Sequence, residues 1–229
     1  MKTLEAMDLT PVEDRNGLLY KREDAYRRLN GVNGSKLRAC FHLAATAQRK
    51  GAMEIVSASS VLSPQSAMAA TVARELGMTS VTIVGGTTPE KAVRNKAVRL
   101  AQEAGSEVVA GPAVGYNPAL QAAARNWVAA NPGSWQMPYG ITTPGGASQE
   151  EIDDFLSVGA NQVRNLPDPV VDLVLPFGSG NTAAGVLHGL LKLGAPSGLE
   201  TVRLMTIGPD RRKWLEDRLN KAGTPLSEA

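Results

Sequence analysis

The chain has few of the residues that build covalent or metal-based frameworks. Its 229 residues include one cysteine, Cys40, and two histidines, His42 and His188. A single cysteine excludes an internal disulfide, and two distant histidines do not form the spacing of a metal cluster. We therefore expect no metal site and assign Cys40 and both histidines to the core or the surface.

Long apolar runs and a strong charge of one sign are also lacking. No apolar run approaches the roughly 18 residues that a membrane-spanning helix needs, and residues 1–5 do not resemble a signal peptide. The net charge of +2 is too small to indicate a nucleic-acid or membrane partner. Hydrophobic residues make up 43% and charged residues 20%, which is typical of a globular protein. These features predict a cytoplasmic protein without a membrane partner.

Apolar strand patterns alternate with helical patterns along most of the chain. The expected strands are residues 54–57, 80–84, 107–110, 135–138, 170–176 and 202–207. The expected helices are residues 36–50, 64–76, 90–103, 118–130, 149–165, 181–193 and 211–221. Strands that alternate with helices form parallel sheets covered by helices. The predicted fold class is therefore α/β, with two lobes that are each a mostly parallel sheet flanked by helices.

A stretch rich in glycine and proline, residues 140–146, indicates a boundary between the lobes. Residues 51–139 form the smaller predicted lobe, and residues 1–50 together with 140–229 form the larger one. In such sheets ligands bind beyond the carboxyl ends of the strands. The loops that follow the strands are therefore the places to look for functional residues.

A glycine loop follows the most apolar strand and opens a helix: Gly178, Ser179, Gly180, Asn181, Thr182. Glycines let the backbone approach a ligand closely. The free N–H groups and the dipole at a helix start favour a phosphate. The loop lacks the Gly-Lys-Ser/Thr ending of nucleoside-triphosphate loops. We predict that it binds a phosphate group of another kind.

Two other interpretations of this loop stay open at this point. Gly178, Gly180 and Ala183 occupy the small positions of a dinucleotide-binding pattern, with Asp210 beyond the next strand. Only one clear strand follows, however, whereas a dinucleotide-binding half has more. The loop is alternatively a tight turn with a purely structural role.

Lys36 lies just after Gly34 and Ser35, at the first turn of an expected helix. A lysine in this place can face a cleft, although a single lysine is usually a solvated surface charge. The other motifs in the sequence change this interpretation of Lys36. Three further motifs share the chain with Ser35-Lys36-Leu37-Arg38: Lys21-Arg22-Glu23-Asp24, Ser63-Pro64-Gln65-Ser66 and the glycine loop with its extension to Gly185.

In order and rough spacing these motifs resemble the fold-type II enzymes that depend on pyridoxal 5'-phosphate (PLP), the tryptophan synthase β-like family. The resemblance covers about residues 9–191 and is greatest to the D-cysteine desulfhydrase, aminocyclopropane-carboxylate deaminase and threonine dehydratase branches. Two further stretches are similar to the first two of these: Met137-Pro138 and Gly145-Gly146-Ala147-Ser148.

The resemblance implies a cofactor and a role for each motif. PLP is expected to form a Schiff base with Lys36, and the residues from Gly178 to Thr182 are expected to hold its phosphate. Ser63, Gln65 and Ser66 are expected to bind the substrate carboxylate at the start of a helix, with Ser63 as the N-cap and Pro64 as the first helical residue. The freed Lys36 amine would then remove the Cα proton.

The sequence departs from the family at two points. Pro64 stands where the family usually has an asparagine that contacts the 3'-hydroxyl of the cofactor. Ser59, Ser60 or Asn181 would then have to orient the ring. Family members also commonly continue well beyond this length, and the additional part carries the polar residue that faces the ring nitrogen.

These observations favour a PLP-dependent lyase or deaminase of amino-acid metabolism, acting on a small amino-acid substrate and assembled as a homodimer. Three alternatives remain. An open cleft would admit an amino acid attached to a larger carrier such as a modified nucleobase. The second alternative is a PLP-binding protein without turnover. The third, based on the glycine loop alone, is a protein that binds a nicotinamide dinucleotide.

Overall fold

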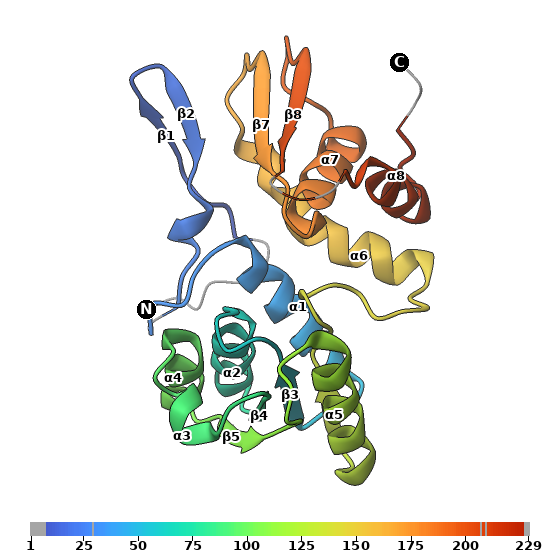
Figure 1. The fold of residues 1–229 in the computed structure, drawn as a ribbon. Helices are drawn as coiled ribbons and strands as arrows, with labels where there is room; N and C mark the ends of the chain where they lie inside the picture. The colour runs from blue at the N-terminus through green and yellow to red at the C-terminus, as the bar shows by residue number, and fades with distance from the viewer. Residues whose placement is uncertain (1–7, 29, 207, 209, 227–229) are drawn as a thin grey trace. The chain divides into compact units, whose positions relative to one another are not determined.

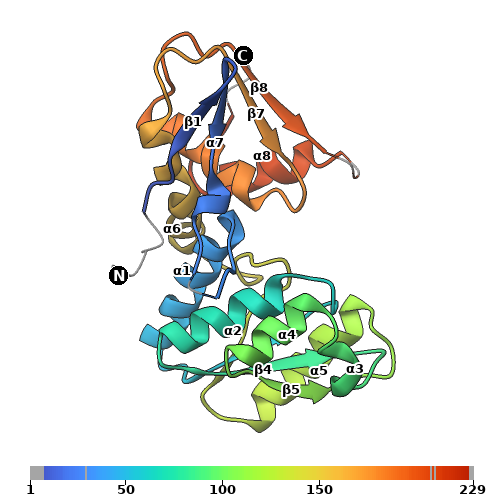
Figure 2. The same ribbon diagram turned by 90° about the vertical axis from the view of Figure 1, so that its left-hand side faces the viewer.

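Strands and helices of the chain divide into two units, drawn in Figure 1 and, turned by 90°, in Figure 2. The computed structural model describes residues 8–28, 30–206, 208 and 210–226. Unit 1 comprises Met1–Tyr26, Gly34–Ala39 and Thr143–Ala229, and unit 2 comprises Arg27–Asn33 and Cys40–Thr142. Residues 1–5 and Ile207, the last residue of a predicted strand, lie outside the described residues.

Unit 2 is built on a four-stranded sheet that is parallel throughout. Its strands are β3 (Glu54–Ala58), β4 (Thr79–Val84), β5 (Glu107–Ala110) and β6 (Ser134–Gln136), in the order β5-β4-β3-β6. The predicted parallel sheet is therefore confirmed. Because the strands are parallel, the loops that follow them all leave from the same edge of the sheet.

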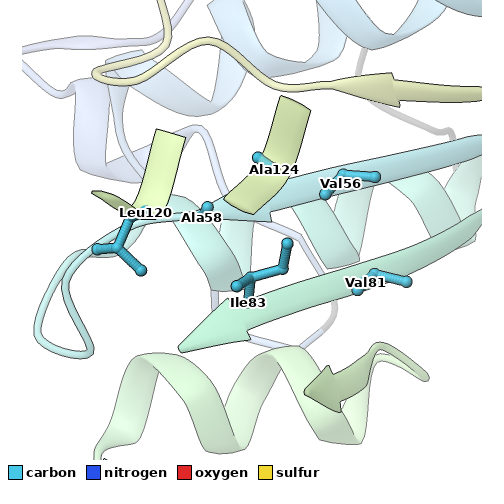
Figure 3. Packing of buried hydrophobic residues seen from close by; sticks show 6 residues of the cluster. All are labelled: Val56, Ala58, Val81, Ile83, Leu120 and Ala124. Carbon is cyan, nitrogen blue, oxygen red and sulfur yellow. The ribbon is translucent and has the colours of Figure 1, made fainter. Parts of the chain in front are cut away.

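Helices cover both faces of this sheet. Helix α5 (Asn117–Ala130) packs on one face, where its Leu120 and Ala124 meet apolar side chains of β3 and β4: Val56, Ala58, Val81 and Ile83 (Figure 3). Side chains alternate along a strand, so Val84 points to the other face. There it packs with Ala92 and Val98 of the helices α3 (Pro89–Ala92) and α4 (Lys96–Glu103). Helix α2 (Gln65–Glu75) packs against α4 through small residues such as Ala70 and Ala101.

Unit 1 contains a parallel pair of strands and an antiparallel hairpin. The parallel pair is β7 (Asp172–Pro176) and β8 (Thr201–Met205), connected through helix α7 (Asn181–Leu193). The hairpin is formed by β1 (Val12–Arg15) and β2 (Leu18–Lys21). The other helical elements are η1 (Glu23–Ala25), α6 (Gln149–Ala160), η2 (Asn161–Asn165) and α8 (Arg212–Lys221). In the described part of the chain no helix is both long and apolar enough to cross a membrane.

The first long helix contributes to both units. Helix α1 (Ser35–Arg49) begins in unit 1, and its residues from Cys40 onward belong to unit 2. The sequence had assigned residues 1–50 to the larger lobe. The later part of α1 and the segment Arg27–Asn33 make contacts within unit 2: Gln48 Nε2 donates to Leu76 O at 2.7 Å, and Arg28 Nε lies 3.3 Å from Glu75 Oε2.

Three local predictions need correction. The hairpin of β1 and β2 was missed, although Asn16 and Gly17 between its strands have the positive φ angles, 58° and 82°, that a two-residue hairpin turn requires. The helix expected over residues 90–103 is broken into α3 and α4, and Asn95 is the N-cap residue of α4. The helix expected over residues 149–165 ends at Ala160 and continues as the 3₁₀ helix η2.

Helices α6 and α7 approach each other so closely that their backbones touch. A Cβ atom added at Gly189 would lie 2.5 Å from Ala160 O, and one added at Gly185 would lie 3.0 Å from Gly159 Cα. Both obstacles are backbone atoms, which cannot rotate away. The small residues of the two helices therefore fix the position of α7, whose other end carries the glycine loop.

Gly189→Ala is expected to lower the free energy of unfolding by about 1–3 kcal/mol, the usual effect of overpacking a core. The direction of this change distinguishes close packing from helix propensity, because alanine normally stabilises a helix interior relative to glycine by about 0.5–1 kcal/mol. Urea denaturation followed by circular dichroism measures the change. Gly145→Ala is the matched control, since a Cβ atom at Gly145 meets nothing within 4 Å. A stabilised Gly189→Ala variant would contradict the close packing.

Candidate functional site

Lys36 is the second residue of helix α1 and is half-buried. The next two residues, Leu37 and Arg38, are almost completely buried, so the first turn of the helix is firmly packed. Burial removes water from the Lys36 amine and lowers its pKa below the usual range. A larger share of this amine is therefore neutral, and a neutral amine is the nucleophilic form.

The glycine loop lies beside this helix start within unit 1. Ser35 Oγ and Thr182 Oγ1 are 3.0 Å apart and share a hydrogen bond. The residue that precedes Lys36 thus contacts the second residue of α7 directly. The structure thus brings the Lys36 motif and the glycine loop together, the two regions for which the sequence predicts a shared cofactor.

The loop between β7 and α7 has a backbone that only glycine adopts easily. Gly180 is buried and has φ 90° and ψ −21°, in the left-handed region. A Cβ atom at this position would also collide with the ring of Trp214 from α8. Gly178 is exposed, and Ser179, Asn181 and Thr182 are partly buried. Gly180 is therefore required by both its conformation and its surroundings.

Two helix N-termini meet at this place. Helix α7 has no side-chain hydrogen bond at its N-cap, and neither α1 nor α7 has an acidic residue in its first turn. The positive dipole ends of the two helices are therefore not neutralised by carboxylates of their own first turns. An anion with several oxygens, such as a phosphate, suits this arrangement.

The third predicted group, Ser63 to Ser66, lies in unit 2 after the carboxyl end of β3. The helix begins one residue later than predicted, because Pro64 is the N-cap residue, with φ −68° and ψ −8°, and Gln65 is the first helical residue. The hydroxyl of Ser63 still accepts a hydrogen bond from Gln65 N at 3.3 Å. Ser63 therefore stabilises the turn, as a capping residue does, from one position earlier.

Buried polar side chains surround this helix start. Gln65 Oε1 accepts a hydrogen bond from Gly140 N at 2.9 Å, which connects α2 to the loop after β6. Ser66 Oγ lies 3.2 Å from Ser59 Oγ. Among the described residues, Gln65 Nε2 and Ser57 Oγ are buried without a hydrogen-bond partner. Unpaired buried polar atoms are costly and concentrate at functional sites.

A family model matches almost the whole sequence. The model described as "pyridoxal-phosphate dependent enzyme" matches residues 4–226. The chain belongs to this family.

One relative of this PLP-dependent enzyme is the O-seryl-dTMP PLP-dependent decarboxylase of Salmonella phage ViI. The two sequences are 34% identical over 222 residues, which covers 92% of this chain and 52% of the relative. The chain thus spans about half the length of the curated relative that it matches.

Solved structures show the same fold at low sequence identity. An aminocyclopropane-carboxylate (ACC) deaminase homologue has a TM-score of 0.61 at 19% identity, covering 89% of this chain and 60% of its own. Diaminopropionate ammonia lyase of Escherichia coli has a TM-score of 0.58 at 17% identity, with coverages of 88% and 57%. A hydrogen sulfide-producing enzyme of Fusobacterium nucleatum has a TM-score of 0.58 at 14% identity, with coverages of 85% and 55%. These likenesses confirm the predicted fold class.

The residues of unit 1 fit the cofactor of this family. The desolvated Lys36 amine suits the cofactor aldehyde, and the backbone from Gly178 to Thr182 suits its phosphate. The family match decides against the nicotinamide dinucleotide. Asp210, the acidic residue of that pattern, pairs instead with Arg212, with Oδ2 and Nη2 2.7 Å apart.

The motif Lys21-Arg22-Glu23-Asp24 fastens the start of α1 in place, a role that its sequence did not indicate. Glu23 Oε2 accepts from Arg38 Nε at 3.0 Å, and Glu23 Oε1 accepts from Thr10 Oγ1 at 2.6 Å. Lys21 Nζ donates to Thr10 O at 2.8 Å, and burial lowers its pKa to about 8. The partners in these bonds are 11 to 15 residues apart, beyond the reach of a helical or strand repeat, so no local pattern reveals the contacts.

The other residues singled out from the sequence have local partners. Ser60 Oγ accepts from Leu62 N at 3.4 Å, within the loop after β3. Ser148 is the N-cap residue of α6 and forms a capping box with Glu151. Its position three residues before a glutamate is the signal of that motif.

The cysteine and the buried histidine of this PLP-dependent enzyme lie in its interior. Cys40 is buried and free, and burial raises the pKa of its thiol. His188 is also buried, with Nδ1 2.8 Å from Thr224 Oγ1 and Nε2 3.0 Å from Asp153 Oδ1. Burial lowers the pKa of His188, and the nearby Asp153 carboxylate opposes this shift. His42 is partly buried, and the described residues contain no group of three ligands that could hold a metal ion.

The lowered pKa of Lys36 predicts a pH dependence. Without added PLP, Lys36 is expected to react with a small aldehyde under reductive conditions at lower pH than a free lysine side chain, whose pKa is 10.5. Mass spectrometry of peptides after modification at a series of pH values measures the midpoint. Lys96, an exposed lysine at the first position of α4, is the internal reference. Equal midpoints for Lys36 and Lys96 would contradict the effect of burial.

Proposed function

We propose that this PLP-dependent enzyme acts on an amino acid attached to a pyrimidine nucleotide and removes the carboxyl group of that amino acid. The similarity that supports the proposal is the 34% identity to the O-seryl-dTMP decarboxylase, which extends over 92% of this chain. The sequence had favoured a lyase or deaminase for a small amino acid and kept the nucleobase-linked substrate as an alternative. The lyases and deaminases among the solved structures are all below 20% identity, and their likeness supports the fold alone.

The residues of unit 1 would hold the cofactor and move the proton. Bound PLP supplies an electron-withdrawing ring that weakens the bonds at Cα of an attached amino acid. Lys36 is proposed to form the covalent link to the cofactor and, once displaced by the substrate, to deliver a proton to Cα after CO₂ has left. Its desolvated position favours both tasks, because burial lowers the pKa of the amine and so increases its neutral share at a given pH.

The helix start of unit 2 is proposed to hold the substrate carboxylate. Pro64 offers no N–H group, and the Gln65 N–H donates to Ser63 Oγ at 3.3 Å. Ser63 accepts in that bond, so its own O–H group can still donate, and Gln65 Nε2 is a buried donor without a partner. Ser66 Oγ lies 3.2 Å from Ser59 Oγ. Ser63, Gln65 and Ser66 are thus proposed to position the carboxylate.

Two further expectations from the sequence accompany this proposal. Homodimerisation, which the family resemblance implies, stays a prediction, and so does a cytoplasmic location. Neither affects the residue roles proposed above, since those rest on contacts within each unit.

Cofactor binding is the first part of the proposal to test. The purified protein with PLP is expected to show an absorption band near roughly 410–430 nm, the range of the cofactor linked to a lysine. Lys36→Ala should abolish the band, whereas Lys96→Ala, a lysine at the start of another helix, should keep it. Gly180→Ala should weaken PLP binding, because a Cβ atom collides with Trp214. A full band in Lys36→Ala would rule out Lys36 as the attachment point.

The reaction is tested with two substrates, free serine and serine linked to dTMP. We expect release of CO₂ from the linked substrate and its loss in Lys36→Ala, measured with serine labelled at the carboxyl carbon. Ammonia and a keto acid from free serine would instead establish the lyase or deaminase. An intact absorption band without either product would establish a binding protein without turnover.

A further inference from the structure

Exposed apolar side chains of unit 2 gather at one edge of its sheet. Within the described residues of this unit, five large apolar side chains are exposed: Met53, Leu62, Val114, Tyr116 and Tyr139. Met53 precedes β3, but the other four lie in loops that follow the carboxyl ends of β3, β5 and β6. Ligands of parallel α/β sheets bind beyond these ends. Exposed apolar groups are thus concentrated where a ligand is expected.

The loop after β6 holds Tyr139 rigidly while leaving its ring accessible. Met137 and Ile141, on either side, are 0% and 1% exposed, whereas Tyr139 is 48% exposed. Ile141 adopts a positive φ of 55°, which is strained for a β-branched residue. Strained backbone of this kind is concentrated at functional sites, where the surrounding structure maintains it.

Hydrogen bonds tie this loop to its neighbours. Met137 N donates to Val56 O at 2.9 Å, and Ile141 N donates to Pro138 O at 3.0 Å. Gly140 N donates to Gln65 Oε1 at 2.9 Å, so the residue next to Tyr139 is bonded to the first residue of α2. Tyr139 therefore lies on a loop fastened to the helix start that is proposed to position the substrate carboxylate.

Glycines hold the loop after β5 in place as well. A Cβ atom at Gly85 would lie 2.8 Å from Val114 O, and one at Gly115 would lie 3.0 Å from Gly85 O. The loops after β4 and β5 are thus in backbone contact. Val114 and Tyr116 extend from this contact with half or more of their surface exposed. The exposed apolar side chains Val114 and Tyr116 therefore lie on a loop whose backbone is held by contacts with the loop after β4.

We propose that Tyr139 is a specificity-determining residue whose ring stacks on the pyrimidine base of the nucleotide that carries the substrate amino acid. This inference rests on the proposed function and adds the residue that recognises the base. A rigid aromatic ring beside the position for the amino acid suits a flat base, because stacking gains contact area with little loss of conformational freedom. Free serine has no flat group that could stack on Tyr139.

The test compares binding of dTMP to the PLP-loaded protein and to its variants by isothermal titration calorimetry. Tyr139→Ala is expected to raise the Kd for dTMP roughly 5- to 100-fold, the effect of losing one base–aromatic stack. Tyr139→Phe should stay within about twofold of the unchanged protein, since the ring is kept.

Tyr20→Ala is the matched control, because Tyr20 is 44% exposed and lies on β2 in unit 1. An unchanged Kd in Tyr139→Ala, with dTMP binding to the unmodified protein, would overturn the role of Tyr139 and leave the proposed function standing. Absence of dTMP binding together with turnover of free serine would overturn both. A changed oligomeric state of Tyr139→Ala in analytical ultracentrifugation, with dTMP affinity preserved, would assign this edge to contacts between copies and also overturn the inference.

Discussion

The meeting of two helix N-termini at the Ser35–Thr182 hydrogen bond is the constraint on which the proposed site depends. Like ends of helix dipoles repel each other, and neither helix has an acidic residue in its first turn. The chain holds them together by packing elsewhere. Arg38 of α1 is anchored through Glu23, and α7 is locked against α6 by glycines. An anion bound between the helix starts would relieve the repulsion, so phosphate binding and stability of this region are linked.

Much of the fold was predictable because its signals are local. Helix α7 and strand β5 begin and end where the apolar pattern predicts, and the parallel sheet follows from the alternation of strands and helices. The missed hairpin also had a local signal, since Asn16-Gly17 separates two short strands. Contacts between residues far apart in the sequence had no such local signal. The bond between Gln65 and Gly140, which spans 75 residues, and the Arg38–Glu23 pair depend on how the chain folds back on itself.

The site residues also divide into those with a local signal in the sequence and those whose contacts only the structure shows. Residue type, order and family resemblance predict roles for Lys36 and for the loop from Gly178 to Thr182, and the structure places Ser35, next to Lys36, in contact with Thr182 of that loop. The start of α2 differs, because Pro64 is the N-cap residue and Ser63 is bonded within the turn. Sequence shows that a donor is missing at Pro64, but only the structure shows that Ser63 Oγ accepts from Gln65 N and that Ser66 Oγ lies 3.2 Å from Ser59 Oγ.

The ring of Trp214 beside Gly180 ties the glycine loop to the last helix of unit 1. A Cβ atom at Gly180 would collide with that ring, so the loop and α8 are in direct contact although 34 residues separate them along the chain. The surroundings of the predicted phosphate loop are therefore completed by a helix that contributes none of the loop's own residues.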